Sequence, residues 1–241
     1  GQTIEIIQAG YYAIPSPINN ITVKGADNLV TVADDWGTHP TVVFDASNSS
    51  GQLSSLNGVV FTNIKFKFSG SNYTGFQHQA GIVTFNNCDF EGLFNGYGNM
   101  VFNDCYFKST TNEYVMWTYG APSLAFNGCG FDVAGKALNV YQENSNYDHI
   151  ITVTNCKFVS STANKPALAI KNNGNGGSGT SPIYYDITIT NSTFEGFGQS
   201  DGDLIGFPTD TPYVNAYGYN GATQPLKVTV DGEVWVDISK N

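Results

Sequence analysis

The amino-acid sequence predicts an all-β solenoid, in which short parallel strands stack coil upon coil. The first observation is a repeated pattern that has apolar first and third residues, a polar bend and a phenylalanine after the bend. Six copies of the pattern end at Phe66, Phe90, Phe107, Phe131, Phe158 and Phe194. The second observation is the alternation before each bend, which is typical of a strand with one buried face. The third is the uneven spacing of the copies, which indicates stacked corners joined by loops of variable length.

The bend of each copy carries a residue that tolerates unusual backbone angles. The bend residues are Asn63, Asn87, Asp104, Gly128, Asn155 and Asn191. Asn, Asp and Gly favour bends because they accept left-handed backbone angles or hydrogen-bond their own backbone. After the bend, four copies place a cysteine at one inward position, namely Cys88, Cys105, Cys129 and Cys156. We expect buried free thiols there, because side chains that stack in parallel make a disulfide awkward.

The repeat resembles that of the right-handed parallel β-helix proteins of the pectin-lyase-like group. In those proteins Asn side chains at the bend often stack in a ladder, and the resemblance implies such a ladder here, interrupted at Asp104 and Gly128. It also implies a single right-handed parallel β-helix domain over residues 1–241, with about nine coils at roughly 25 residues a coil. Residues 1–50 are expected to form the opening coils and a cap. Residues 222–241 are expected to form a hairpin cap about an Asp-Gly turn.

The composition is acidic and narrows the range of partners. The chain has 20 carboxylates against 10 basic residues, and every basic residue is Lys. An acidic surface without Arg argues against nucleic acid, which needs neutralised phosphates. It also argues against polyanionic glycans unless calcium intervenes. We find no apolar run long enough to span a membrane and expect no membrane insertion. The resemblance suggests a secreted or cell-surface protein.

A third group of strands is expected between the corners. The predicted strands are Tyr114–Tyr119, Ala137–Tyr141, Ala167–Lys171 and Asp203–Phe207. With their large apolar residues inward, the alternate side chains form outward rows, which the last strand would extend with Gly206 and Pro208. The outward side chains that we expect to bind a glycan are Trp117, Tyr119, Asn139, Tyr141 and Lys171. Aromatic rings could stack on sugar rings there, while amides and the amine bind hydroxyls.

The alternative function is catalysis by a pair of carboxylates. Glycoside hydrolysis needs two carboxylates roughly 5 to 10 Å apart, and five acids are candidates for such a pair: Glu113, Asp132, Glu143, Asp201 and Asp203. The resemblance weakens this reading, because the arginine base usual in lyases of this shape and the polygalacturonase motifs are both missing. We therefore assign no catalytic residue and favour a protein that is not an enzyme.

Few motifs in the sequence resemble a metal-binding site. Asp201 and Asp203 flank a glycine and are candidate calcium ligands, since calcium takes carboxylate and carbonyl oxygens. No other cofactor is indicated. The three histidines, His39, His78 and His149, are far apart in the sequence, and we expect each to lie in a loop.

The sequence thus favours a non-catalytic extracellular module, either a cell-surface adhesin or a glycan-binding protein. Its expected partner is a polysaccharide or a host or cell-surface glycan. Two alternatives stay open: a polysaccharide lyase or glycoside hydrolase that acts on an acidic or host polysaccharide, and a structural spacer or phage fibre segment. The oligomeric state does not follow from the sequence.

Overall fold

The computed structural model describes most of the chain. The described residues are 1–7, 10–11, 18–26, 42–43, 52–54, 56–68, 75–77, 81–109, 111, 113–119, 123–142, 148–162, 165–172, 184–198, 206–207, 214–218 and 225–239. The backbone alone is described at 10–11, 42–43, 52–54, 77, 119, 141–142, 171–172, 206–207 and 215–218. Within the described residues there are strands and turns, and no helix is long and apolar enough to cross a membrane.

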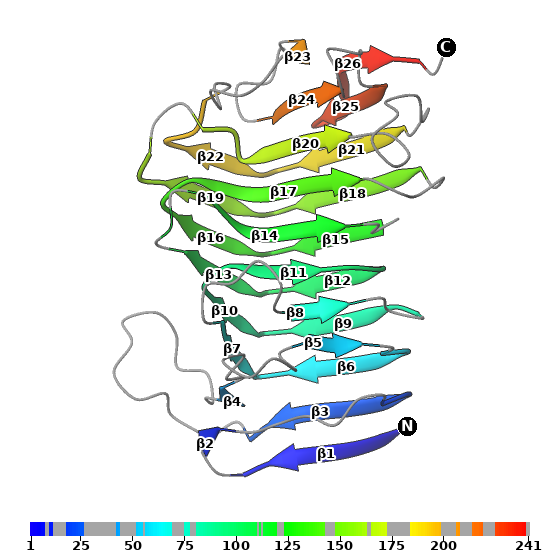
Figure 1. Cartoon of the computed structure of the whole chain (residues 1–241), viewed down its shortest axis with the longest axis vertical. Coiled ribbons are helices and arrows are strands. Elements are labelled where there is room, and N and C mark those ends of the chain that lie inside the picture. The colour runs from blue at the N-terminus through cyan, green and yellow to red at the C-terminus, as the bar shows by residue number, and fades with distance from the viewer. Residues whose placement is uncertain are drawn as a thin grey trace.

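Sheet 1 is the longest sheet and runs the whole height of the molecule (Figure 1). Its strands, in spatial order, are β1 (Gln2–Ile6), β3 (Ile21–Gly25), β6 (Val59–Thr62), β9 (Val83–Asn86), β12 (Met100–Asn103), β15 (Ser123–Asn127), β18 (His149–Thr154), β21 (Tyr185–Thr190), β25 (Leu226–Val230) and β26 (Glu233–Ile238). All neighbours are parallel except the last pair, β25 and β26, which form an antiparallel hairpin about Asp231 and Gly232.

Two further sheets complete the stack. Sheet 2 contains β7 (Lys65–Lys67), β10 (Asp89–Glu91), β13 (Tyr106–Ser109), β16 (Gly130–Val133), β19 (Lys157–Ser160) and β22 (Thr193–Glu195). Sheet 3 contains β5 (Gln52–Ser54), β8 (Gly75–Gln77), β11 (Phe94–Gly96), β14 (Tyr114–Tyr119), β17 (Lys136–Gln142), β20 (Leu168–Asn172), β24 (Val214–Gly218) and β23 (Gly206–Phe207). A separate short pair joins β2 (Gly10–Tyr11) to β4 (Val42–Val43).

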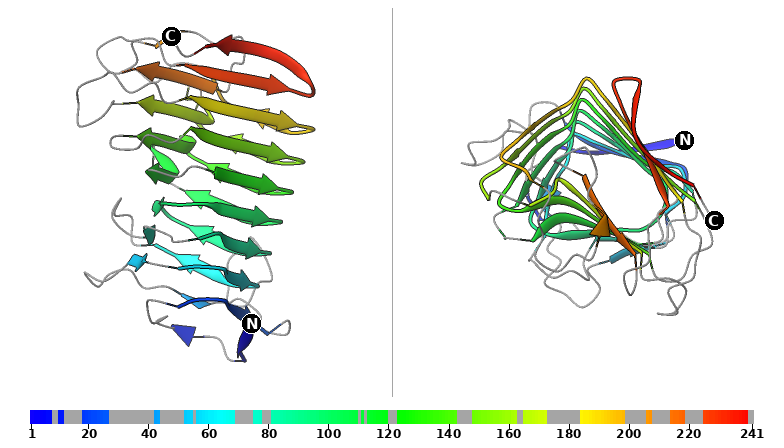
Figure 2. Two further views of the ribbon diagram at one scale, coloured as in Figure 1. Left: turned by 90° about the vertical axis from the view of Figure 1, so that its right-hand side faces the viewer. Right: turned by 90° about the horizontal axis from the view of Figure 1, so that it is seen from above.

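From β8 onward the chain visits the three sheets in turn, so that most strands pair in parallel with the third strand along the chain. Figure 2 shows the result as a stack with the N-terminal strands at one end and the C-terminal strands at the other. The all-β prediction is confirmed, and these stacked parallel sheets are consistent with a parallel β-helix.

The bend between sheets 1 and 2 has left-handed backbone angles at every copy. The predicted bend residues all have positive φ: Asn63, Asn87, Asp104, Gly128, Asn155 and Asn191. The same geometry recurs at Asn20 and Asp231, which the repeat pattern did not identify. Left-handed angles crowd Cβ in most residues, and Asn, Asp and Gly accept them most readily. The choice of residue at this position therefore follows from the turn.

Amide ladders follow the bend. Asn87 Nδ2 donates to Asn63 Oδ1 at 2.8 Å, and Asn191 Nδ2 donates to Asn155 Oδ1 at 2.7 Å. In the middle coils, where Asp104 and Gly128 replace asparagine at the bend, the ladder moves one residue toward the N-terminus. There Asn103 donates to Asn86 at 2.8 Å, and Asn127 donates to Asn103 at 2.9 Å.

The interior is filled by two aromatic stacks. In sheet 1, Phe61, Phe85, Phe102 and Phe126 stack in that order, with ring centroids 4.9 to 5.4 Å apart. In sheet 2, the stack runs through Phe66, Phe90, Phe107, Phe131, Phe158 and Phe194. The two stacks meet edge to face, an arrangement worth about 0.5 to 1.5 kcal/mol per aromatic pair beyond area burial. The core therefore lies along the axis of the stack.

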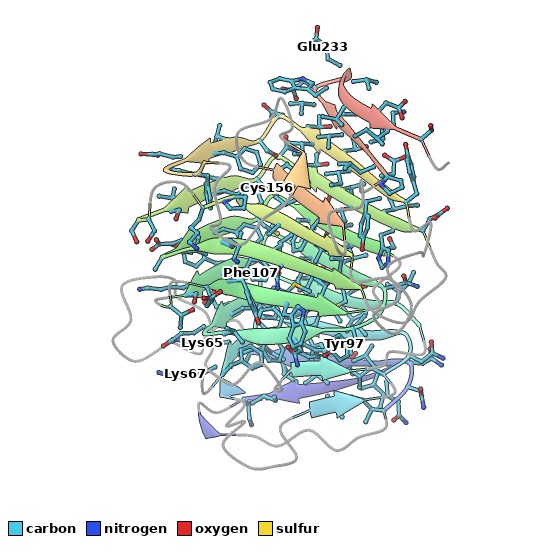
Figure 3. The ribbon with its side chains drawn as sticks, turned by 45° about the horizontal axis from the view of Figure 1, so that its top comes forward. Lys65, Lys67, Tyr97, Phe107, Cys156 and Glu233 are labelled. Carbon is cyan, nitrogen blue, oxygen red and sulfur yellow. The ribbon has the colours of Figure 1, made fainter. Side chains whose placement is uncertain are left out.

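The four cysteines are buried free thiols, as expected. Each thiol donates to a carbonyl oxygen of the preceding coil, for example Cys105 Sγ to Phe85 O at 3.5 Å and Cys156 Sγ to Phe126 O at 3.4 Å. Burial raises the pKa of the Cys105 thiol well above its ordinary value. Figure 3 shows Cys156 and Phe107 among the stacked strands.

One predicted strand of sheet 3 pairs differently from the expectation. Of the expected continuation, Asp203–Phe207, the structure describes Gly206 and Phe207, which form β23 and pair antiparallel with β24. The parallel neighbour of β20 is β24, so Val214 of β24, rather than a residue of the predicted strand, is the register neighbour of Leu168. Short apolar runs in a glycine-rich and aspartate-rich segment look alike in sequence, and only pairing distinguishes them.

Candidate functional site

Sheet 3 holds the predicted glycan-binding residues in register, although only the backbone is described at Tyr119, Tyr141 and Lys171. Trp117 of β14 lies beside Asn139 of β17, and Tyr119 lies beside Tyr141. Lys171 of β20 is the next neighbour of Tyr141. Met116 and Thr118, which flank Trp117, are fully buried in the interior, so that Trp117 projects outward.

Side-chain burial divides this face into an open centre and closed flanks. Trp117 and Asn139 are half-buried. Their row continues to Asn95 of β11 on one side and to Ala169 of β20 on the other, and both are 0% exposed. The accessible part of the row is therefore the short stretch over β14 and β17. The Tyr114 ring lies near it, with its centroid 6.4 Å from that of Trp117.

Asn95 is a residue that the sequence pattern missed, because β11 is a three-residue strand with no alternation to reveal it. Its side chain is buried beside Trp117. Among the described residues, neither the oxygen nor the nitrogen of its amide has a hydrogen-bond partner. An unsatisfied buried amide costs about 1 to 3 kcal/mol. A bound water or a ligand hydroxyl at this position would recover part of that cost.

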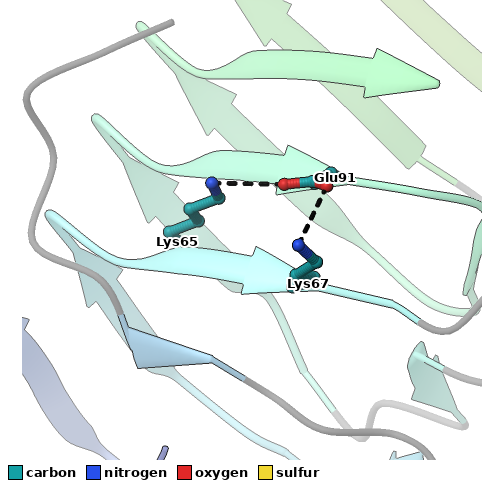
Figure 4. A network of polar contacts seen from close by, with 3 residues as sticks. All are labelled: Lys65, Lys67 and Glu91. Carbon is teal, nitrogen blue, oxygen red and sulfur yellow. Dashed lines mark ion pairs between the residues drawn. The ribbon is translucent and has the colours of Figure 1, made fainter. Parts of the chain in front are cut away.

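A second polar cluster lies on the outer face of sheet 2 (Figure 4). Glu91 bridges two lysines, with Oε2 3.2 Å from Lys65 Nζ and Oε1 3.2 Å from Lys67 Nζ. The Lys65 side chain is only 4% exposed, whereas that of Lys67 is 52% exposed. Asp89, the register neighbour of Lys65, is 1% exposed. Buried charges of opposite sign thus lie together, as burial requires.

The cluster extends along sheet 2 to a tyrosine. Tyr106 pairs in register with Asp89. Partial burial raises the pKa of the Tyr106 hydroxyl, and the carboxylates of Asp132 and Asp89 raise it further. A phenol with a raised pKa stays protonated and can donate a hydrogen bond at neutral pH. The cluster therefore brings carboxylates, ammonium groups and a phenol together on one face.

Of this cluster only Asp132 was a candidate acid in the sequence analysis, because the other members are recognised only through the register of neighbouring strands. The signal was present in the repeat itself. Charged or polar residues flank the core phenylalanine in β7, β10 and β13, as Lys-Phe-Lys, Asp-Phe-Glu and Tyr-Phe-Lys. Once these copies are aligned on phenylalanine, the register places opposite charges beside each other.

Asp201 and Asp203, the predicted calcium ligands, lie outside the part of the chain that the structure describes. Among the described residues no group of three His, Cys, Asp or Glu side chains is placed to hold a metal ion. His39 and His78 also lie outside the described residues.

The expectation for His149 is wrong. It lies in β18 rather than in a loop, is 1% exposed and stacks on Tyr185, with ring centroids 4.8 Å apart. Its parallel neighbours in sheet 1 bury it. His149 is in phase with the buried residues Ile151 and Val153, so the alternation of the repeat extends to it, one position before the first apolar residue of the pattern.

Comparison with known proteins adds no relative to this picture. No family model, curated protein sequence or solved structure matches the chain.

Proposed function

We propose that the chain is a non-catalytic carbohydrate-binding module of the adhesin kind, secreted or displayed at a cell surface. The observation that carries the proposal is the pairing of Trp117 with Asn139 on the outer face of sheet 3, where both are half-buried. An indole offers an apolar face on which a sugar ring stacks, and an adjacent amide offers a donor and an acceptor for sugar hydroxyls.

The charge of the protein favours a neutral glycan. The net charge is −10 and the chain has no Arg, so that an anionic polysaccharide would be repelled over most of the surface. Lys171 is the one basic residue of the proposed site. We therefore expect hydroxyl-rich, uncharged sugars, bound by stacking and amide contacts.

We also propose that the fold is a right-handed parallel β-helix of the pectin-lyase-like kind, with about nine coils. Two observations support this assignment. The bends between sheets 1 and 2 are left-handed at asparagine, with amide ladders along them. Phenylalanine and cysteine stack in the interior.

The test compares glycan retention by the protein and by a Trp117→Ala variant. An array of neutral plant, mucin and microbial glycans identifies a ligand, and calorimetry measures its affinity with and without calcium. Trp117→Ala should abolish retention, and Asn139→Ala should weaken it. Tyr184→Ala is the matched control, because Tyr184 is a half-buried aromatic residue directly before β21 of sheet 1. Equal retention by Trp117→Ala and the control would remove this face from consideration.

A polysaccharide lyase or hydrolase is the second candidate, favoured by one observation. Glu91, Asp89, Lys65 and Tyr106 converge on the outer face of sheet 2. Against it, an amine acts as a base only when neutral, and Lys65 is both buried and ion-paired. Release of unsaturated or reducing ends, lost in Glu91→Gln and kept in Trp117→Ala, would favour this candidate over the binding module.

A further inference from the structure

The outer face of sheet 1 carries two straight rows of short side chains over the six strands from β6 to β21. We name it the threonine–asparagine face. The first row consists of Val60, Thr84, Val101, Ala125, Thr152 and Thr188. The second row consists of Thr62, Asn86, Asn103, Asn127, Thr154 and Thr190. Between the rows lie the fully buried residues of the sheet 1 core, such as Phe85 and Phe102.

The composition of this face departs from that of the chain. The chain is 12% charged and 14% aromatic, yet none of the positions in the two rows is charged or aromatic. Protein interfaces depend on aromatic, Met and Arg anchors, and sugar-binding platforms depend on aromatic rings. The face has neither, so that its chemistry fits an uncharged partner bound by methyl, hydroxyl and amide groups over a wide area.

The two rows are aligned across the coils. The register from β6 to β21 runs without a bulge, so that each position of a row lies directly beside the next. Figure 1 shows these six strands stacked one above another.

Hydrogen bonds and restricted rotamers fix many side chains of the threonine–asparagine face in the absence of a partner. Asn86, Asn103 and Asn127 are joined by amide hydrogen bonds of 2.8 and 2.9 Å. Threonine and valine are branched at Cβ, which leaves them few χ1 rotamers. All positions of both rows are half-buried except Thr190, which is exposed, so that each keeps some contact with solvent. Binding would therefore order few side chains, which lowers its entropic cost.

The spacing of the face is periodic in two directions. Strands repeat every 4.8 Å or so, and residues two apart on a strand are about 6.6 Å apart. These repeats are close to the two oxygen repeats on the prism face of hexagonal ice. Threonine methyl groups and amide groups on such a grid can hold water in an ice-like arrangement, whereas charged groups would bind liquid-like hydration water. The occupant that fits a neutral and periodic surface of this kind is a crystalline lattice of water.

We propose that the threonine–asparagine face binds ice. This activity is separate from the proposed glycan site, because it uses the outer face of sheet 1 rather than that of sheet 3. Bound protein would block growth of the crystal planes that match the grid. The expected result is a gap between the melting and freezing temperatures, and slower recrystallisation of small ice grains.

The test measures thermal hysteresis and ice recrystallisation for the full chain and for three variants. Thr152→Tyr places a bulky ring in the first row and should lose most of the hysteresis gap. Thr84→Tyr does the same three strands away, and serves if Thr152→Tyr fails to fold. Val159→Tyr is the matched control, because Val159 is a half-buried β-branched residue on the outer face of sheet 2. It should keep the gap. Circular dichroism and the melting temperature show which variants are folded.

Four outcomes would overturn the proposal. The first is an intact chain that shows neither hysteresis nor slowed recrystallisation. The second is an equal effect of Thr152→Tyr and Val159→Tyr. In the third, sedimentation shows a dimer that Thr152→Tyr dissociates, which would assign the face to a second copy of the chain. In the fourth, Thr152-dependent retention on crystalline cellulose or chitin without hysteresis would assign it to a polysaccharide surface.

Discussion

At the scale of single residues, the left-handed bend explains why one copy of the repeat uses glycine. Gly128 has φ of 65°, and a Cβ placed there would collide with Asp104 Oδ1. Elsewhere the same bend accepts asparagine, whose side chain joins the ladder. Glycine at this bend is therefore an alternative solution to the same backbone requirement.

Replacing Gly128 should test that requirement. Gly128→Ala should lower the free energy of unfolding by about 1 to 2 kcal/mol, the cost of a left-handed angle in an ordinary L-residue. Gly128→Asn, which matches Asn87 and Asn155, should lower it by less. Urea unfolding followed by circular dichroism measures both. Equal losses in the two variants would show that the collision with Asp104, rather than the backbone angle, decides the choice.

The two lysines that contact Glu91 should contribute very differently to stability. Lys65→Met leaves Asp89 and Glu91 without their buried cation, and breaking a buried pair costs about 3 to 5 kcal/mol. Lys67 is 52% exposed, and pairs of that kind contribute about 0 to 1 kcal/mol. Lys67→Met is therefore the control. Chemical unfolding of both variants measures the difference, and similar losses would contradict the burial argument.

At the scale of elements, β26 covers the edge of β25, the last of the parallel strands of sheet 1. It pairs antiparallel with β25, and Trp235 and Val236 pack against the core. An uncovered edge presents unpaired backbone groups that can pair with another chain. The hairpin thus ends the sheet and protects it.

Deleting residues 231–241 should therefore promote self-association. The truncated chain should sediment as dimers or larger species at concentrations where the intact chain does not. Adding Thr229→Lys to the truncated chain should reduce association, because a lysine on an edge strand opposes pairing. Sedimentation velocity measures both species, and a truncated chain that behaves like the intact one would show that β26 is not needed to cover the edge.

At the scale of the whole molecule, several buried groups make the free energy of unfolding depend on pH in the alkaline range. Burial raises the pKa of Cys105, Tyr106 and Tyr185 in the folded chain. In the unfolded chain thiols titrate near about 8.5 and phenols near about 10. Between the unfolded and folded values the folded chain holds more protons, so that stability falls as pH rises.

The free energy of unfolding should thus be constant near neutral pH, begin to fall above about pH 8.5 and fall more steeply above about pH 10. Urea unfolding across this range measures the slope. Tyr106→Phe should reduce the steep part of the slope, since it removes one of the titrating phenols. A stability that stays level up to about pH 10 would mean that Cys105 does not remain protonated in the folded chain.

The sequence by itself determined the repeating unit: strand, left-handed bend, strand, with phenylalanine and cysteine inside. This was possible because each coil must satisfy the same backbone angle and fill the same interior, so that residue type recurs at fixed offsets, as at Asn87 and Cys88. The same alternation predicted that Trp117 and Asn139 are neighbours on adjacent strands, as the structure shows.

Only the tertiary structure decided which strand follows β20 and which polar side chains meet on the outer faces. Pairing between coils is set by loop lengths and by contacts between residues distant in sequence, and irregular strands such as β11 and β24 leave no periodic trace. The burial of Lys65 and the alignment of the two rows of the threonine–asparagine face are likewise properties of stacked neighbours. A single coil read from the sequence has no neighbours, and therefore cannot reveal either property.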